Sequence, residues 1–331
     1  MGIEQVTSGA AAEARKAANN DSITSLLAQI NLAKLPRLDD LYTLYNYQPP
    51  TETAQQVPIE QLSLQWDWIE DAESNARREA RALLPKGRSD AYVTVPLDGA
   101  QLILEKYPSS EKYYQATDTT GLRKPVVSVT LETENTERIA EFRADLNPKK
   151  NEWDLSHRLV EEKYRGQEVG SCMLGFLEGV IQDAANASNT PQECVIGARQ
   201  LDVILFAMRN GYRPKTEEDT ANLKAILTGS EKDAFLVTTA LGHESLGAKR
   251  RPGYIFKREV IAEKLKDQRD GDTIANDDKK IIDRALIALN EGGDVDPEAL
   301  ELIFYKDPGE YQGNAVTVTF HKTFKPQAQG L

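Results

Sequence analysis

The segment from Val160 to Ser171 contains the residue types needed to hold a phosphate group. A short apolar run, Leu155 to Val160, precedes a loop that contains Arg165, Gly166 and Gly170, and an amphipathic helix is predicted to start at Ser171. The N–H groups of such a loop converge, and a helix N-terminus offers unpaired donors and a partial positive charge to an anion. The sequence therefore predicts a site for a phosphate-bearing ligand.

The spacing in this loop resembles the acyl-CoA-binding signature of the GCN5-related N-acetyltransferases, the GNAT superfamily. The signature is Arg/Gln-x-x-Gly-x-Gly/Ala, with an apolar strand end shortly before it; here the loop begins at Arg165 and Val160 is at the strand position. The resemblance implies acetyl-CoA or another acyl-CoA as co-substrate. The binding residues that it implies are Val160, Arg165, Gly166, Gln167, Glu168, Val169, Gly170 and Ser171.

Glu168 departs from the signature, which has its central glycine at this position. Glycine lets the backbone approach the diphosphate, whereas glutamate adds a side chain and a like charge. Two unit charges roughly 6 Å apart repel by about 1–3 kcal/mol at an effective dielectric near 20, and by less where solvent and salt screen them. We expect Glu168 to weaken binding without preventing it. The alternative is an ordinary polar loop between a strand and a helix.

A second segment, from Arg199 to Pro214, resembles the later helix and strand of the same superfamily. Gly211 suits a left-handed helix cap, and Tyr212 begins the next extended piece. The superfamily often has a tyrosine one helical turn before that glycine, which protonates the departing CoA thiolate, but Ala207 is found there. The acid would then be Tyr212, Tyr164 or water, or no acid would act.

The resemblance implies that an amine attacks the thioester of acyl-CoA directly, with the backbone N–H near Val160 at the thioester carbonyl. Such a reaction requires a base for the amine and stabilisation of an oxyanion. His157 and Glu161 project from the same face of the predicted strand by its period of two, and they are candidate bases. Glu141, on the preceding strand, is a third candidate.

Alternating residues predict an antiparallel meander before the loop, with strands at Ala91–Val95, Val126–Thr133, Arg138–Ala144 and Trp153–Glu161. That order is the one expected for the early strands of the superfamily. The predicted fold is therefore α/β (α+β): a GNAT-like, mixed and mostly antiparallel central sheet flanked by helices, with added helical segments.

The predicted domain organisation has four parts: a helical N-terminal extension at 1–85, the acyl-CoA-binding core at 86–215, a mostly helical insertion or lid at 216–310, and a closing strand and tail at 311–331. Helical spacing predicts helices near Ile23–Leu32, Ile59–Leu84, Thr216–Leu227 and Asp277–Asn290. Val316–Phe324 alternates and is predicted to close the sheet. The alternative closing strand is Tyr254–Lys257.

The chain has 331 residues, and its formal net charge of −12 argues against nucleic acid as a partner. Because the sequence has neither a long apolar run nor a signal-peptide core, we expect a cytoplasmic protein without a membrane span. Two cysteines, Cys172 and Cys194, predict no disulfide framework and no metal site.

The expected acceptor is an amine, in a small molecule or in a protein lysine or N-terminus. The helical extensions are candidate surfaces for a homodimer or a protein partner. The alternative to an N-acyltransferase is a catalytically silent GNAT-fold module that binds acyl-CoA or another protein.

Overall fold

We describe a computed structural model of the chain. The structure describes residues 35–48, 91–97, 100–107, 126–133, 137–147, 149–240, 251–271, 274–293, 295–304 and 313–327. The chain divides into two compact units: unit 1 comprises residues 1–51 and 197–320, and unit 2 comprises residues 52–196 and 321–331. The predicted helices at Ile23–Leu32 and Ile59–Leu84 lie outside the described residues.

The largest sheet has the strand order β1-β2-β3-β4-β5-β6-β10-β7. Its first five strands, each antiparallel to the next, are β1 (Ala91–Leu97), β2 (Ala100–Tyr107), β3 (Val126–Thr133), β4 (Arg138–Asn147) and β5 (Glu152–Val160). Strand β6 (Gln192–Ala198) pairs with β5 in parallel. The prediction of a mixed, mostly antiparallel sheet flanked by helices is confirmed.

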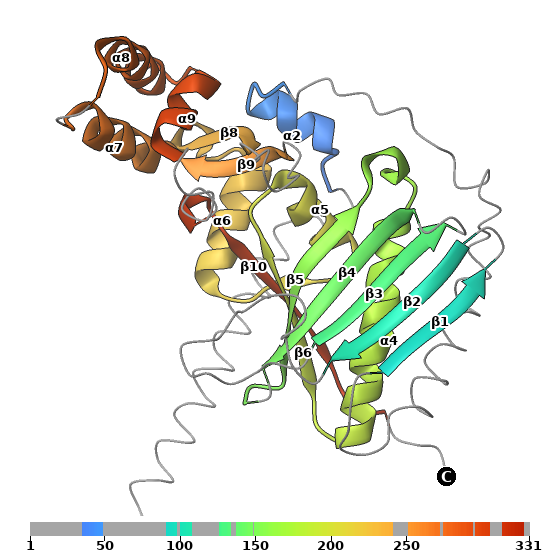
Figure 1. Ribbon diagram of the computed structural model, residues 1–331. Coiled ribbons are helices and arrows are strands. Elements are labelled where there is room, and N and C mark those ends of the chain that lie inside the picture. Colours follow the sequence, from blue (N-terminus) through green and yellow to red (C-terminus); the bar gives the residue numbers. More distant parts are fainter. Residues whose placement is uncertain are drawn as a thin grey trace, which may run out of the picture. The chain divides into compact units, whose positions relative to one another are not determined.

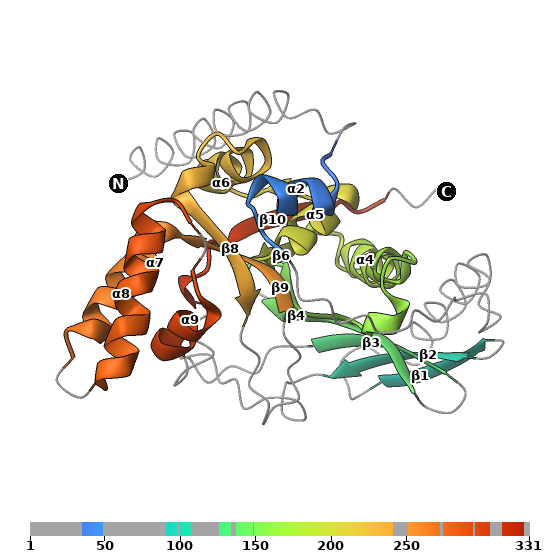
Figure 2. The same ribbon diagram turned by 90° about the horizontal axis from the view of Figure 1, so that it is seen from above.

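In unit 2, helix α4 (Val169–Ser188) lies across one face of the sheet formed by β1 to β5, as both views show (Figure 1, Figure 2). The helix follows a 3-10 turn, η4 (Glu162–Tyr164). Its buried apolar side chains include Met173, Leu174, Phe176, Leu177 and Ile181. Burying one such side chain contributes about 1.5–3 kcal/mol, so the packed stripe fixes the helix, and with it the preceding loop, against the sheet.

Unit 1 contains most of the remaining helices and a second sheet. Its helices are α2 (Leu38–Leu44), α5 (Leu201–Arg209), α6 (Glu217–Thr228), α7 (Arg258–Arg269), α8 (Asn276–Asn290) and α9 (Pro297–Phe304), with the 3-10 turn η5 (Lys232–Ala234). Strands β8 (Phe235–Ala240) and β9 (Arg251–Lys257) pair antiparallel in a separate sheet. Strand β7 (Arg213–Pro214) and the first part of β10 (Val318–Phe324) also belong to this unit.

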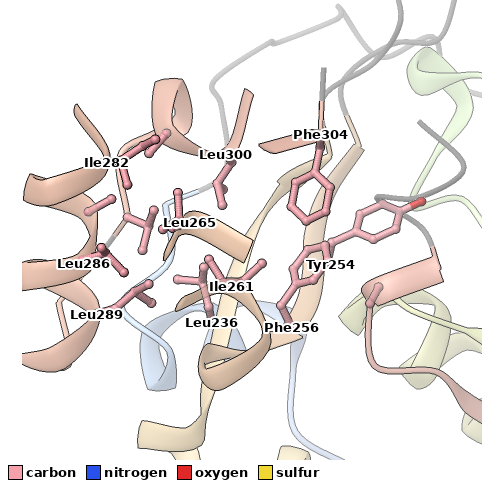
Figure 3. Close-up of a cluster of buried hydrophobic side chains, with 14 residues drawn as sticks. Leu236, Tyr254, Phe256, Ile261, Leu265, Ile282, Leu286, Leu289, Leu300 and Phe304 are labelled. Atoms are coloured by element: carbon pink, nitrogen blue, oxygen red, sulfur yellow. The ribbon is translucent and has the colours of Figure 1, made fainter. Parts of the chain in front are cut away.

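Figure 3 shows how the three last helices of unit 1 cover the small sheet. Leucine and isoleucine side chains from α7, α8 and α9 converge on Leu236 from β8 and on Tyr254 and Phe256 from β9. The ring of Phe256 stacks on that of Phe304, with the centroids 5.9 Å apart. This cluster is an apolar core in its own right, so we assign it a structural role.

Asp219 is a buried connector inside unit 1. Its Oδ2 accepts hydrogen bonds from the backbone N–H and the hydroxyl of Thr216, at 3.1 and 2.6 Å, which caps helix α6. Its Oδ1 accepts the N–H of Thr319 on β10 at 2.7 Å. One carboxylate therefore joins a helix start to a strand that lies far away in the sequence.

Several predicted elements have the expected positions. The helices predicted at Thr216–Leu227 and Asp277–Asn290 correspond to α6 and α8, and the predicted final strand corresponds to β10. Of the two candidate closing strands, β10 belongs to the large sheet, whereas Tyr254–Lys257 lies in β9 and pairs with β8. Within the described residues, no helix is long and apolar enough to cross a membrane.

Candidate functional site

Strand β5 is paired differently at its two ends. Near its start, Glu152–Asp154 pair with Glu193–Val195 of the parallel strand β6. The indole N–H of buried Trp153 donates to Oε1 of buried Gln192 at 3.1 Å, and this hydrogen bond joins the start of β5 to β6. Beyond Asp154, β5 pairs with β4 alone among the strands that the structure describes.

The side chains at the far end of β5 are half-buried. Trp153 and Leu155 are buried while their neighbours Asp154 and Ser156 are exposed, whereas every residue from His157 to Val160 has intermediate exposure. Alternation is the mark of a strand with one covered face, and its loss means that neither face is fully covered here. This segment, His157–Val160, is called the open end of β5: no described strand pairs with it on the β6 side, and its side chains are partly accessible.

The loop after β5 is tied back to that strand. The N–H of Glu161 donates to the carbonyl of Ile139 on β4 at 2.9 Å. Arg165 is exposed, and its Nε donates to the carbonyl of Val160 at 3.0 Å. No described acidic side chain forms an ion pair with Arg165. Its guanidinium charge is therefore not neutralised by the described part of the chain.

Glu168 occupies the N-cap of α4 in a left-handed conformation, with φ 63° and ψ 1°. This is the position at which the GNAT signature has glycine, and glycine adopts such a conformation without the cost of about 1 kcal/mol that a side chain brings. Gly166 is also left-handed, with φ 77°. The loop therefore makes two left-handed turns, and Glu168 adopts its turn under backbone strain.

The start of α4 presents free donors. The Glu168 side chain makes no cap hydrogen bond, and no acidic residue lies in the first helical turn. The first helical bond runs from the N–H of Cys172 to the carbonyl of Glu168 at 3.1 Å. The N–H groups of Val169, Gly170 and Ser171 precede it, so they are available to an anion, which the helix dipole also favours.

The three candidate bases lie together at the open end of β5. Nη1 of Arg138 donates to Glu141 Oε2 at 2.8 Å, and its Nη2 and Nε donate to Glu161 Oε1 at 3.2 and 3.3 Å. His157 Nε2 is 3.9 Å from the same oxygen of Glu141. The exposed fractions of the side chains are 40% for His157, 18% for Glu141 and 28% for Glu161, so water reaches all three.

A second ion pair borders this cluster. Lys163 pairs with Glu137, and the hydrogen bond to that carboxylate raises the pKa of Lys163 above its usual range. The Lys163 ammonium also lies 5.1 Å from the ring centroid of Tyr164. Tyr164 itself is buried at η4. The open end of β5 is therefore surrounded by charges of both signs.

The remaining predicted residues fall in different places. Gln167 is half-buried and Ser171 exposed, while Val169 is buried beneath the helix start. Tyr212 belongs to unit 1, where it is buried and its N–H donates to the carbonyl of Ala207 at 3.0 Å. Sequence inspection did not single out Arg138, although the antiparallel register that brings the start of β4 to the end of β5 could have indicated it.

No protein-family model matches the chain, and no curated protein matches it. Among solved structures, one match is a protein described as an acyl-CoA N-acyltransferase from Klebsiella pneumoniae subsp. pneumoniae MGH 78578, with 19% identity, a TM-score of 0.24, and coverage of 27% of this chain and 59% of that one. Another is nourseothricin acetyltransferase, with 12% identity, a TM-score of 0.23, and coverage of 38% of this chain and 70% of that one. The first match thus spans about three fifths of its solved neighbour.

Proposed function

We propose that the chain is an acyl-CoA-dependent N-acyltransferase of the GNAT type, with acetyl-CoA or another acyl-CoA as co-substrate. One observation carries the proposal: uncapped N–H groups at the start of α4 and the guanidinium of Arg165, which no described acidic side chain neutralises, lie directly after a strand end that no described strand pairs on its β6 side. Helix N-termini and arginine side chains are typical diphosphate donors. The edge of β5 beyond Asp154, where no described strand pairs on the β6 side, would offer backbone groups to the amides of the pantetheine arm.

The proposed reaction transfers the acyl group to an amine. The amine nitrogen attacks the thioester carbon, the carbon–sulfur bond breaks, and an amide and the CoA thiol are formed. The amine gives up a proton to a base and the departing thiolate takes one up. We propose the N–H near Val160 as a donor to the oxyanion and His157, Glu161 or Glu141 as the base; Tyr164 or water would be the acid.

We further propose that the acceptor is a primary amine of a small molecule or of a protein, which suits a chain with a net charge of −12. The segments at 1–85 and 216–310, predicted to be helical or mostly helical and outside the proposed core at 86–215 and the closing strand and tail at 311–331, would then act as an extension and a lid. They are also the surfaces that we propose for a homodimer or a protein partner.

The second candidate function is acyl-CoA or protein binding without catalysis. Two observations favour it. Glu168 brings a carboxylate to the helix start that would receive the diphosphate. Ala207 stands where the resemblance leads us to expect the acid. Binding of acyl-CoA without turnover of any amine would support this function.

Calorimetric titration with acetyl-CoA and with free CoA at low salt tests the proposal. We expect micromolar binding of both ligands, and its loss in the double variant Arg165→Ala, Gly170→Asp, which removes the guanidinium and places a carboxylate among the donors. Because aspartate is favourable in the first turn of a helix, this variant should remain folded. Arg209→Ala, an exposed arginine at the end of α5, is the matched control and should bind normally. Absence of binding by the wild-type chain would reject acyl-CoA as its ligand.

A further inference from the structure

Residues 35–48 form a small structural element within unit 1. Helix α2 begins after Arg37, whose backbone N–H donates to Oδ2 of Asp40 at 3.1 Å. After the helix, the N–H of Tyr47 donates to the carbonyl of Tyr42 at 2.8 Å, and the two rings meet edge to face with their centroids 5.1 Å apart. Both ends of this segment are therefore stabilised by contacts within the segment itself.

Three side chains of the segment are buried. Leu41, Tyr42 and Tyr45 are each at most 8% exposed. Leu41 is four positions before Tyr45 and Tyr42 is three, so the three lie on one face of the helix. The hydroxyl of Tyr45 donates to the carbonyl of Ile226, near the end of α6, at 2.8 Å. Burial raises the pKa of this hydroxyl to about 12. These side chains have the character of the buried aromatic anchors that carry most of the affinity of an interface.

The surface that receives the segment has glycine at two points of close approach. A Cβ atom at Gly229, which caps the end of α6, would lie 2.9 Å from both Cδ atoms of Leu44. A Cβ atom at Gly253 of β9 would lie 3.3 Å from Cε1 and from the hydroxyl oxygen of Tyr42. Helix α2 also packs against α5. The receiving surface, formed by α5, the end of α6 and Gly253, therefore complements the segment in shape.

Most of unit 2 separates the segment from its receiving surface along the chain. Tyr45 and Ile226 are 181 positions apart, and residues 52–196 between them belong to unit 2. Among the described residues before position 52, none belongs to a strand of either sheet. The described part of the segment is therefore a docked helix that takes no part in the strand pairing of unit 1.

We propose that this surface is a peptide-recognition surface and that residues 35–48 are its ligand, held by docking and able to leave without unfolding unit 1. The partner that the surface fits is a short helix with a leucine, a tyrosine next to it, and a second tyrosine three positions further on. Short helices of this kind bind by laying the anchors of one face on a complementary surface. The docking does not depend on the proposed acyl-CoA chemistry.

A cleaved full-length chain tests the proposal. A site for a specific protease is inserted between Thr51 and Glu52, where the N-terminal part of unit 1 ends, and cleavage is confirmed by mass. We expect fragment 1–51 to dissociate on dilution and to be displaced by an excess of a fluorescent 35–48 peptide. The fluorescence anisotropy of this peptide should give a Kd of about 1–100 μM. Circular dichroism should show that the chain remains folded after the fragment is removed.

Single substitutions in the peptide test which side chains carry the binding. Tyr42→Ala removes a buried ring and should weaken binding at least about 30-fold. Tyr45→Phe removes only the hydroxyl that donates to Ile226, and it should weaken binding by about 3–10-fold. Thr43→Ala, at an exposed position of the same helix, is the matched control and should change Kd by less than about twofold.

A fragment that leaves only when the circular dichroism signal of the folded protein is lost would overturn the proposal, because the segment would then belong to the core of unit 1. A fragment that does not exchange with the peptide under native conditions would also overturn it, and so would a folded chain that does not rebind the peptide. The same holds if Thr43→Ala weakens binding as much as Tyr42→Ala does.

Discussion

The two ends of strand β5 differ in their strand pairing and in the burial of their side chains. At the start, β5 pairs with the parallel strand β6, and the buried side chain of Trp153 donates a hydrogen bond to the buried side chain of Gln192. At the other end, the strand loses its parallel partner and its side chains are half-exposed. A strand that is held rigidly at one end can leave its edge open at the other end without unfolding. A binding site requires both a rigid scaffold and an accessible edge.

Among the predicted effects, Trp153→Ala should cause the largest loss of unfolding free energy. Trp153→Ala removes a buried ring and leaves the Gln192 amide oxygen without the indole donor, so we expect a loss of about 3–5 kcal/mol of unfolding free energy. Leu159→Ala, at the open end, is the matched comparison and should cost about 1 kcal/mol or less, because its side chain is half-exposed. Urea denaturation measures both. Equal losses would mean that the two ends are equally packed.

Replacing Glu168 should change both the stability of the chain and its affinity for acetyl-CoA at the start of α4. Glu168→Gly relieves the left-handed strain, and we expect a gain of up to about 1 kcal/mol in unfolding free energy. Removing the carboxylate should also tighten acetyl-CoA binding by about tenfold at most. Glu168→Ala is the control, because it removes the charge but keeps the strain: it should improve binding without improving stability. Unchanged binding in both variants would mean that the carboxylate does not face the ligand.

The smallest effect is expected from the Lys163–Glu137 pair. Because the folded pKa of Lys163 is raised above its ordinary value of 10.5, the pair stabilises the fold fully below that pH, and its contribution disappears as the pH rises through the folded pKa. Lys163→Gln should therefore lower the thermal midpoint slightly near neutral pH and not at all in strong alkali. A difference that grew with pH would show that the ion pair is not its origin.

Much of the sheet could be predicted because its signal is local. The strand predicted at Trp153–Glu161 is observed at Glu152–Val160, since alternation survives in the residues that are covered on one face. The predicted left-handed cap at Gly211 is also confirmed, with φ 79°. Strand β2 was not predicted, although Ala100–Tyr107 contains an apolar run, and neither was strand β8.

The details of the site were harder to predict because they depend on tertiary contacts. Helix α4 begins at Val169 and not at the predicted Ser171, because Glu168 adopts a conformation that its residue type does not suggest. The cluster around Arg138 requires the register of two strands, which no single segment specifies. The loss of pairing beyond Asp154 is likewise a property of two strands and not of one.

Asp219 has a consequence for how the chain is made. Its hydrogen bond to Thr319 joins positions 100 residues apart. A ribosome that has released Asp219 must still synthesise that intervening stretch before β10 can occupy the carboxylate. Until then the start of α6 retains its own Thr216 cap but lacks the strand beside it, so unit 1 is completed late during translation. Slow elongation between these positions would lengthen the time during which a chaperone or a protease meets the unfinished unit.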